Sequence, residues 1–139
     1  MKTKVFKACV ESILLNGSES WMLNVTRTRR LDGTYTKMLR SAYNISWKDH
    51  PTIATIYGRL PRISQVVRSR RLALAGHVSR HDEPAGKLIT WVPGENRRVG
   101  RPIVTIRHII EDETGLSGNE LLNAMSDRDK WRKDFVCFT

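Results

Sequence analysis

Apolar residues in the first half of the chain recur at intervals of three and four, the period of an amphipathic α-helix. One series ends at the sequence NGS at 16–18, where a glycine favours helix termination. A second series predicts a helix from a Thr26 cap to about Asn44. The first contains Val5, Phe6, Cys9, Val10, Ile13 and Leu14, and the second Leu31, Tyr35, Met38, Leu39 and Ala42.

The opposite side of the predicted helix 26–44 is basic. Gly33 weakens this helix by about 1 kcal/mol relative to alanine. The cations placed largely away from its apolar stripe are Arg27, Arg30, Lys37 and Arg40.

A third long helix is predicted at 61–80, because Pro61 suits a first helical turn. Its apolar stripe contains Ile63, Val66, Val67, Leu74 and Val78. We expect Arg70 and His77 to project into this stripe as structural residues. The arginines expected on its flanks or outside it are Arg62, Arg68, Arg71 and Arg80.

The remaining sequence also favours helices, with no strand-length alternation of apolar and polar residues. We expect a short helix after Thr52, a helical turn at 87–91, an irregular basic loop at 92–102 and a helix at 103–113. Two further helices begin at the Ser117–Glu120 capping box and at an Asp127 cap.

The predicted fold is therefore an all-α, small helical bundle of about five to seven helices. We expect a first group of helices at 1–50 and a basic C-terminal helical region at 51–139, packed as one unit.

The charge is strongly positive, with 24 Lys and Arg against 14 Asp and Glu in 139 residues. The excess is +8 at 59–110, where eleven basic residues stand against three acidic ones. Such a surface attracts polyanions and gains affinity from released counterions. Nucleic acid is the expected partner, with its contacts centred on the middle of the chain.

Cys9 and Cys137 are too few for a disulfide framework, and they lack the spacing of paired metal ligands with any histidine. The apolar run at the N-terminus is interrupted by Glu11 and Ser12, and no run reaches membrane-spanning length. We expect an intracellular protein, in the nucleus or cytoplasm, with no membrane partner.

Eight arginines are the predicted phosphate ligands, since guanidinium groups form charge-assisted, often bidentate bonds with phosphate. A solvated basic face is the alternative interpretation. The segment RRVGRP at 97–102 also resembles the core of an AT-hook, although a basic loop is the better interpretation. The eight are Arg62, Arg68, Arg71, Arg80, Arg97, Arg98, Arg101 and Arg107.

His77 and His81 have the four-residue spacing of helical metal ligands, but no third ligand or general-base glutamate accompanies them. We expect no metal, no cofactor and no catalytic centre, because the carboxylates are dispersed. The tryptophans could stack on unpaired bases, but core packing is favoured. Those expected to be structural are Trp21, Trp47 and Trp131.

Several phrases, read in order, resemble the C-terminal portion of the reverse transcriptases of LINE-type, non-LTR retrotransposons. They are ACVESILLNGSESW at 8–21, RRLDGTYTKMLRSAYNISWKDHPT at 29–52, RRLALAGHVSRH at 70–81, GRP at 100–102 and ETGLSGNELLNAMSDRDKWRK at 113–133.

The resemblance implies the thumb and the following segment of such a polymerase, the part that holds the primer–template duplex. In that family the palm, upstream of the matched segment, carries the metal-binding aspartates in an Ala-Asp-Asp turn, a sequence that these 139 residues lack. The first hypothesis is therefore a catalytically inert fragment that binds RNA, DNA or hybrid backbones. The second is a structural remnant that docks on a reverse transcriptase palm domain or another protein.

Overall fold

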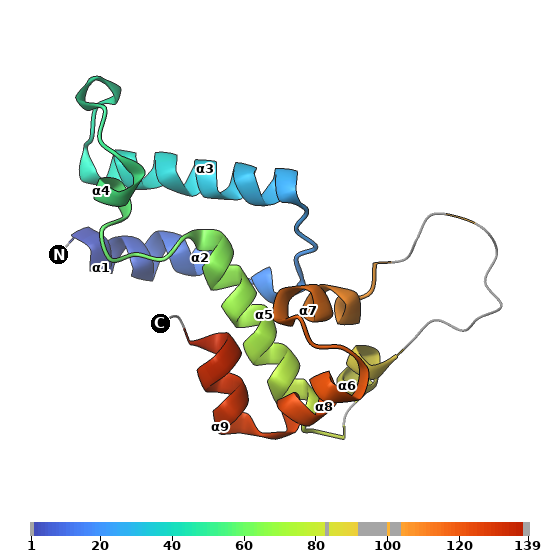
Figure 1. Ribbon diagram of the computed structural model, residues 1–139. Helices are drawn as coiled ribbons and strands as arrows, with labels where there is room; N and C mark the ends of the chain where they lie inside the picture. Colours follow the sequence, from blue (N-terminus) through green and yellow to red (C-terminus); the bar gives the residue numbers. More distant parts are fainter. Residues whose placement is uncertain (1, 83, 92–99, 101–103, 138–139) are drawn as a thin grey trace. The chain divides into compact units, whose positions relative to one another are not determined.

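The computed structural model describes residues 2–82, 84–91, 100 and 104–137, and these residues form helices, turns and connections with no strand among them. The all-α prediction is confirmed (Figure 1). The chain divides into two compact units, unit 1 at Met1–Arg68 and unit 2 at Ser69–Thr139. The boundary between these units lies after residue 68, whereas the sequence predicts a boundary after residue 50.

Unit 1 begins with one helical run, made of α1 (Lys2–Phe6), a π-helical turn (Lys7–Glu11) and α2 (Ser12–Leu14). Gly17 then takes a left-handed conformation with φ of 68°, which glycine adopts without steric cost. The long helix α3 (Val25–Tyr43) follows, and then α4 (Ile53–Tyr57). Both α1 and α4 contact α3.

The ends of α3 are fixed by two asparagines. The Asn24 side chain accepts a hydrogen bond from the backbone N of Arg27 at 2.8 Å, so Asn24 is the N-cap and not the predicted Thr26. Asn44 ends the helix with φ of 56°, and its backbone N–H bonds to the carbonyls of the last turn.

The core of unit 1 forms where α1, α3 and α4 meet. Tyr35 and Leu39 of α3 are fully buried, and the Phe6 ring meets the Tyr35 ring edge-on, 5.6 Å between centroids. Tyr57 packs on the other side of Tyr35 at 6.0 Å. Ile56, Tyr57, Ile63 and Val67 belong to this cluster, which places the residues after 50 in unit 1.

The helix α5 (Ile63–Ser79) begins in unit 1 and ends in unit 2. Unit 2 continues with α6 (Pro84–Thr90), α7 (Ile106–Thr114), α8 (Gly118–Ser126) and α9 (Arg128–Trp131), which runs into a π-helical turn (Arg132–Val136). The Asp127 side chain caps α9 by accepting from the backbone N of Asp129 and Lys130, as predicted. Ser117 is the N-cap of α8, but its side chain makes no capping bond. The predicted loop at 92–102 lies outside the described residues, apart from Gly100.

Trp131 is the centre of the second core. It is 2% exposed, and its indole Nε1 donates to the Leu72 carbonyl at 2.8 Å. Gly76 of α5 lies directly against the ring, because a Cβ at this position would come within 2.5 Å of the indole. The absence of a side chain at Gly76 therefore allows the contact between α5 and α9.

The second half of the predicted apolar stripe of α5 is only partly correct, because Val78 packs against the second core but Leu74 is exposed. Ile63 and Val67 are buried in unit 1, as expected, but the side chains of this helix that form the core of unit 2 are Leu72 and Ala75. At about 100° per residue, these lie roughly 130° around the helix from the first pair. A single continuous stripe cannot describe a helix whose two halves enter different cores.

Candidate nucleic-acid interface

The two units have the same number of basic residues but different net charges. Residues 1–68 contain 12 Lys and Arg against 4 Asp and Glu, which leaves +8. Residues 69–139 contain 12 against 10, which leaves +2. The structural division therefore places most of the net positive charge in unit 1.

A cationic face on α3 carries part of this charge. Arg29, Arg30 and Lys37 are exposed, and Arg40 is half-buried. We call these four residues the α3 cationic face. Their mean direction around the helix axis is roughly 150° from that of the buried Tyr35 and Leu39. At a rise of 1.5 Å per residue, Arg29 and Arg40 are about 16 Å apart along the axis.

Two of the four carboxylates of unit 1, Glu11 and Asp32, bond to donors inside the unit. Glu11 accepts a hydrogen bond from the Tyr35 hydroxyl at 2.9 Å. Burial is the main cause that raises the pKa of Tyr35 well above its ordinary value, and the hydrogen bond to Glu11 is the second. The hydroxyl therefore keeps its proton. Asp32 accepts from the backbone N of Ser64 at 3.1 Å and from its Oγ at 2.9 Å. These carboxylates bond to neutral donors rather than to the α3 cationic face.

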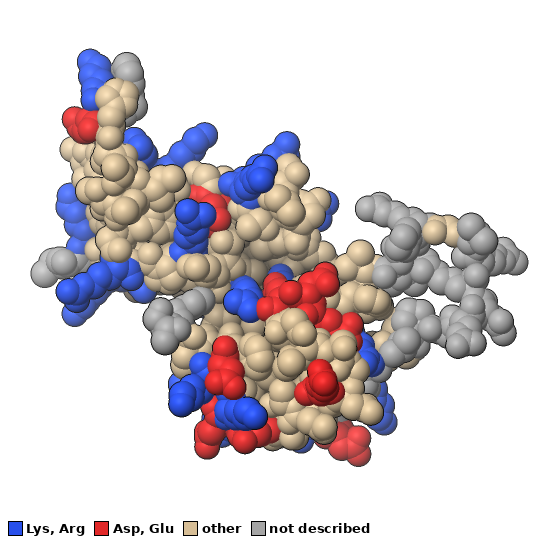
Figure 2. Space-filling view, in the orientation of Figure 1, with Lys and Arg blue, Asp and Glu red and all other residues tan. Residues whose placement is uncertain are grey.

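Figure 2 shows the resulting distribution. Lys and Arg side chains are distributed over the visible surface of the unit that contains α1, α3 and α4, with few acidic side chains among them. Over α7 and α9 of unit 2, acidic side chains are prominent and stand among basic ones.

Two of the predicted phosphate ligands, Arg62 and Arg68, lie on unit 1 and are exposed. Arg68 already interacts with another part of the protein. Three others, Arg97, Arg98 and Arg101, lie outside the described residues.

The remaining three are engaged in holding unit 2 together. Arg71, expected near the solvent, is 4% exposed and forms an ion pair with Glu113. Arg80 is half-buried and donates to the Met125 carbonyl at 2.8 Å. The expected orientation of Arg71 is wrong, because it belongs to the face of α5 that enters the second core.

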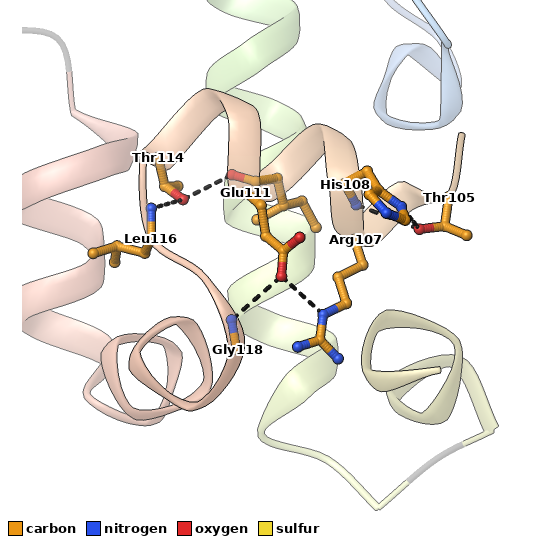
Figure 3. Close-up of polar contacts among 8 residues, drawn as sticks. Thr105, Arg107, His108, Glu111, Thr114, Leu116 and Gly118 are labelled. Atoms are coloured by element: carbon orange, nitrogen blue, oxygen red, sulfur yellow. Dashed lines mark hydrogen bonds and ion pairs between the residues drawn. The ribbon is translucent and has the colours of Figure 1, made fainter. Parts of the chain in front are cut away.

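Arg107 is part of a polar network at α7 (Figure 3). Its Nε donates to Glu111 Oε1 at 2.9 Å, and the same oxygen accepts from the backbone N of Gly118 at 3.3 Å. The bond from Arg107 is the main reason that the pKa of Glu111 is lowered. At the start of α7, Thr105 Oγ1 lies 2.6 Å from His108 Nδ1. Glu111 therefore joins α7 to the beginning of α8, and the same carboxylate oxygen engages Arg107.

The predicted structural residues have varied environments. Trp21 is half-buried against the core of unit 1, and Trp131 is the centre of the second core. Arg70 is half-buried and has an interaction partner. His77 is exposed, so its expected inward orientation is wrong, because it lies on the side of α5 opposite Leu72 and Ala75. The side chain of Trp47 lies outside the described part of the structure.

Three members of the α3 cationic face were visible in the sequence as the polar side of a helix, namely Arg30, Lys37 and Arg40. They are not among the predicted phosphate ligands, because those lie in the chain segment with the largest excess of positive charge. The clustering of cations on one face of the predicted helix 26–44 is the sequence signal that identifies them. That Arg29 belongs to the same face became clear only from the structure of α3.

Within the described residues, no group of three or more His, Cys, Asp or Glu side chains could hold a metal ion. None of the described helices has the combined length and apolar character needed to cross a bilayer. No protein-family model matches the chain, and neither a curated protein nor a solved structure shows detectable similarity to it.

Proposed function

We propose that this chain binds the phosphate backbone of RNA, DNA or their hybrid through unit 1, without strong sequence preference and without catalytic activity of its own. The observation that supports this is the exposed row of Arg29, Arg30 and Lys37, with Arg40 beside them, in a unit of net charge +8. Its carboxylates Glu11 and Asp32 are bonded to internal hydroxyl and amide donors.

The spacing of the cationic face suits a backbone. About 16 Å along α3 corresponds to roughly five nucleotides of one duplex strand at 3.4 Å each. Long cationic side chains on one helix face can reach successive phosphates, and phosphate contacts carry no base information. This agrees with the proposed relationship to the thumb of a LINE-type reverse transcriptase, a segment that holds a duplex while the palm performs the chemistry.

The test is a fluorescence-anisotropy titration with labelled single-stranded RNA, single-stranded DNA and an RNA–DNA hybrid, each in two unrelated sequences. Affinity should fall steeply with salt and vary little with sequence. The double variant Arg30→Gln/Lys37→Gln should flatten the slope of log K against log salt by about 2, because two phosphate contacts are lost.

The matched control is Lys130→Gln/Lys133→Gln, which removes two exposed cations from unit 2. It should leave the slope nearly unchanged. Equal losses from both variants would indicate general charge attraction, and a flat salt response of the original protein would contradict nucleic-acid binding altogether. Primer extension with the same substrates should yield no product.

A second function, docking onto another protein such as a polymerase palm, is supported by an apolar groove of about 440 Å³ in unit 2. Leu88 and Trp91 at its edge are 65% and 52% exposed. If this groove is the docking site, Arg30→Gln/Lys37→Gln should bind a palm domain normally, whereas Leu88→Ser should lose this binding. Size-exclusion chromatography with light scattering would show whether this groove instead joins copies of the chain.

A further inference from the structure

Unit 2 contains a basic pocket that is separate from the α3 cationic face. It has a volume of about 460 Å³, and its charged or titratable lining residues are all Arg or His. They are His77, Arg80, His81, Arg128 and Arg132, with Trp131 between them.

Helical spacing explains why these groups converge. His77 and His81 are four residues apart at the end of α5, and their ring centroids are 4.6 Å apart. Arg128 and Arg132 are also four apart, in α9 and at the start of its π-helical turn, so both project from one side of that helix. The contact of Trp131 with Gly76 keeps the two helices close together.

The pocket gathers positive charge without carboxylates in its described lining. Arg80 is held in place by its bond to the Met125 carbonyl. Asp127, the N-cap of α9, accepts two backbone N–H bonds and, with Asp134, lines a different depression. Placing like charges together is unfavourable unless an anion compensates them.

We infer that this pocket binds a phosphate group in its dianionic, monoester form. Three guanidinium groups offer planar, paired donors that match phosphate oxygens, and each imidazole adds an N–H donor. A phosphodiester inside a strand has one negative charge and two bridging substituents, so it would use fewer of these donors. A concave site of this volume suits a small phosphomonoester or the phosphorylated end of a strand.

The experiment is a titration of the full chain with inorganic phosphate at constant ionic strength, followed in ¹H–¹⁵N spectra by the indole signal of Trp131 and in ¹H–¹³C spectra by the ring signals of His77 and His81. Saturable shifts at these residues are expected. Arg132→Gln and His81→Gln should each weaken binding by about tenfold, because each removes a bond to a charged group.

Lys133→Gln is the matched control, since Lys133 is an exposed cation next to Arg132 that does not line the pocket. It should bind phosphate normally, and so should Arg30→Gln/Lys37→Gln, which separates this site from the proposed backbone interface. Absence of shifts at Trp131 and the histidines, or an equal loss in Lys133→Gln, would overturn the inference.

Two further ligands identify the source of the phosphate group. A trinucleotide with a 5′-phosphate should bind about tenfold more tightly than its 5′-hydroxyl form if strand ends occupy the pocket. Equal binding of the two trinucleotides, with phosphate still bound, would assign the pocket to free phosphomonoesters. Circular dichroism of each variant confirms that the fold is retained.

Discussion

Unit 1 and unit 2 each contain 12 Lys and Arg, yet they use these residues differently. In unit 1 the carboxylates of Glu11 and Asp32 bond to hydroxyl and amide donors, and the cations of α3 stay exposed. In unit 2 the carboxylates of Glu111 and Glu113 bond to arginines. Because unit 1 has 4 Asp and Glu and unit 2 has 10, equal numbers of cations leave net charges of +8 and +2.

This difference shows that the number of arginines in a segment is a poor measure of its capacity to bind phosphate. A guanidinium group already paired with a carboxylate must lose that bond before it contacts a ligand, and a buried one must also be exposed. The number of cations that can bind phosphate depends on which of them pair with carboxylates. In this chain, the packing of the two cores determines those pairs.

The largest effect is expected for Arg71→Met in unit 2. Removing the buried arginine breaks its ion pair with the Glu113 carboxylate, which should lower the free energy of unfolding by about 3 kcal/mol. Urea denaturation followed by circular dichroism measures this change. Arg62→Met, an exposed arginine of unit 1, should change stability by less than about 0.5 kcal/mol. Similar values for the two would mean that Arg71 is not a structural residue.

Gly76→Ala should lower the free energy of unfolding by about 2 kcal/mol, because the new methyl group would overlap the Trp131 ring. The matched change in unit 1 is Gly33→Ala, where the helix surface is open. It should stabilise the protein by about 0.5–1 kcal/mol through higher helix propensity. Thermal unfolding of both variants tests the contrast, and a neutral Gly76→Ala would contradict the close contact between α5 and α9.

Asp32→Asn should destabilise unit 1 by about 1 kcal/mol, since the bonds from Ser64 lose their charged acceptor. The same change raises the charge of unit 1, so nucleic-acid affinity should increase while stability decreases. Denaturation and anisotropy on one preparation measure both quantities. A decrease in both would mean that the conformation held by Asp32 matters more for binding than its charge.

The smallest effect is expected from the protonation of Glu111. Its pKa is lower in the folded protein than its ordinary value of 4.5, so the carboxylate contributes stability above that value and loses it as the pH falls through the folded pKa. Glu111→Gln should cost less than about 1 kcal/mol at pH 7, and the difference from the original protein should shrink in acid. Urea denaturation between neutral and acidic pH checks this, and a difference that stays constant with pH would exclude an ionic contribution.

Local patterns were sufficient for much of the helical structure. The apolar residues of α3 keep one phase over the whole helix because they face one core, and Tyr35 and Leu39 were correctly placed in its stripe. The Asp127 cap was also predictable, since a capping bond joins residues close in sequence. The same reasoning failed for α5, because Val67 and Leu72 enter different cores and no periodicity in the sequence marks the change.

The candidate sites depend still more on distant residues. Arg71 and Glu113 are 42 residues apart, and nothing in either neighbourhood identifies the other. The basic pocket similarly combines residues of α5 with residues of α9. Three of the selected arginines, Arg97, Arg98 and Arg101, remain predictions from the sequence.

The sequence by itself determined that the chain is helical and carries a large positive charge, because helix periodicity, capping and net charge are properties of neighbouring residues or of composition. Only the tertiary structure decided which cations are available to a ligand. The fold determines which side chains are buried together, so Arg71 is buried and paired with Glu113, 42 residues away, while Arg107 pairs with Glu111 on its own helix and Arg30 and Lys37 stay exposed.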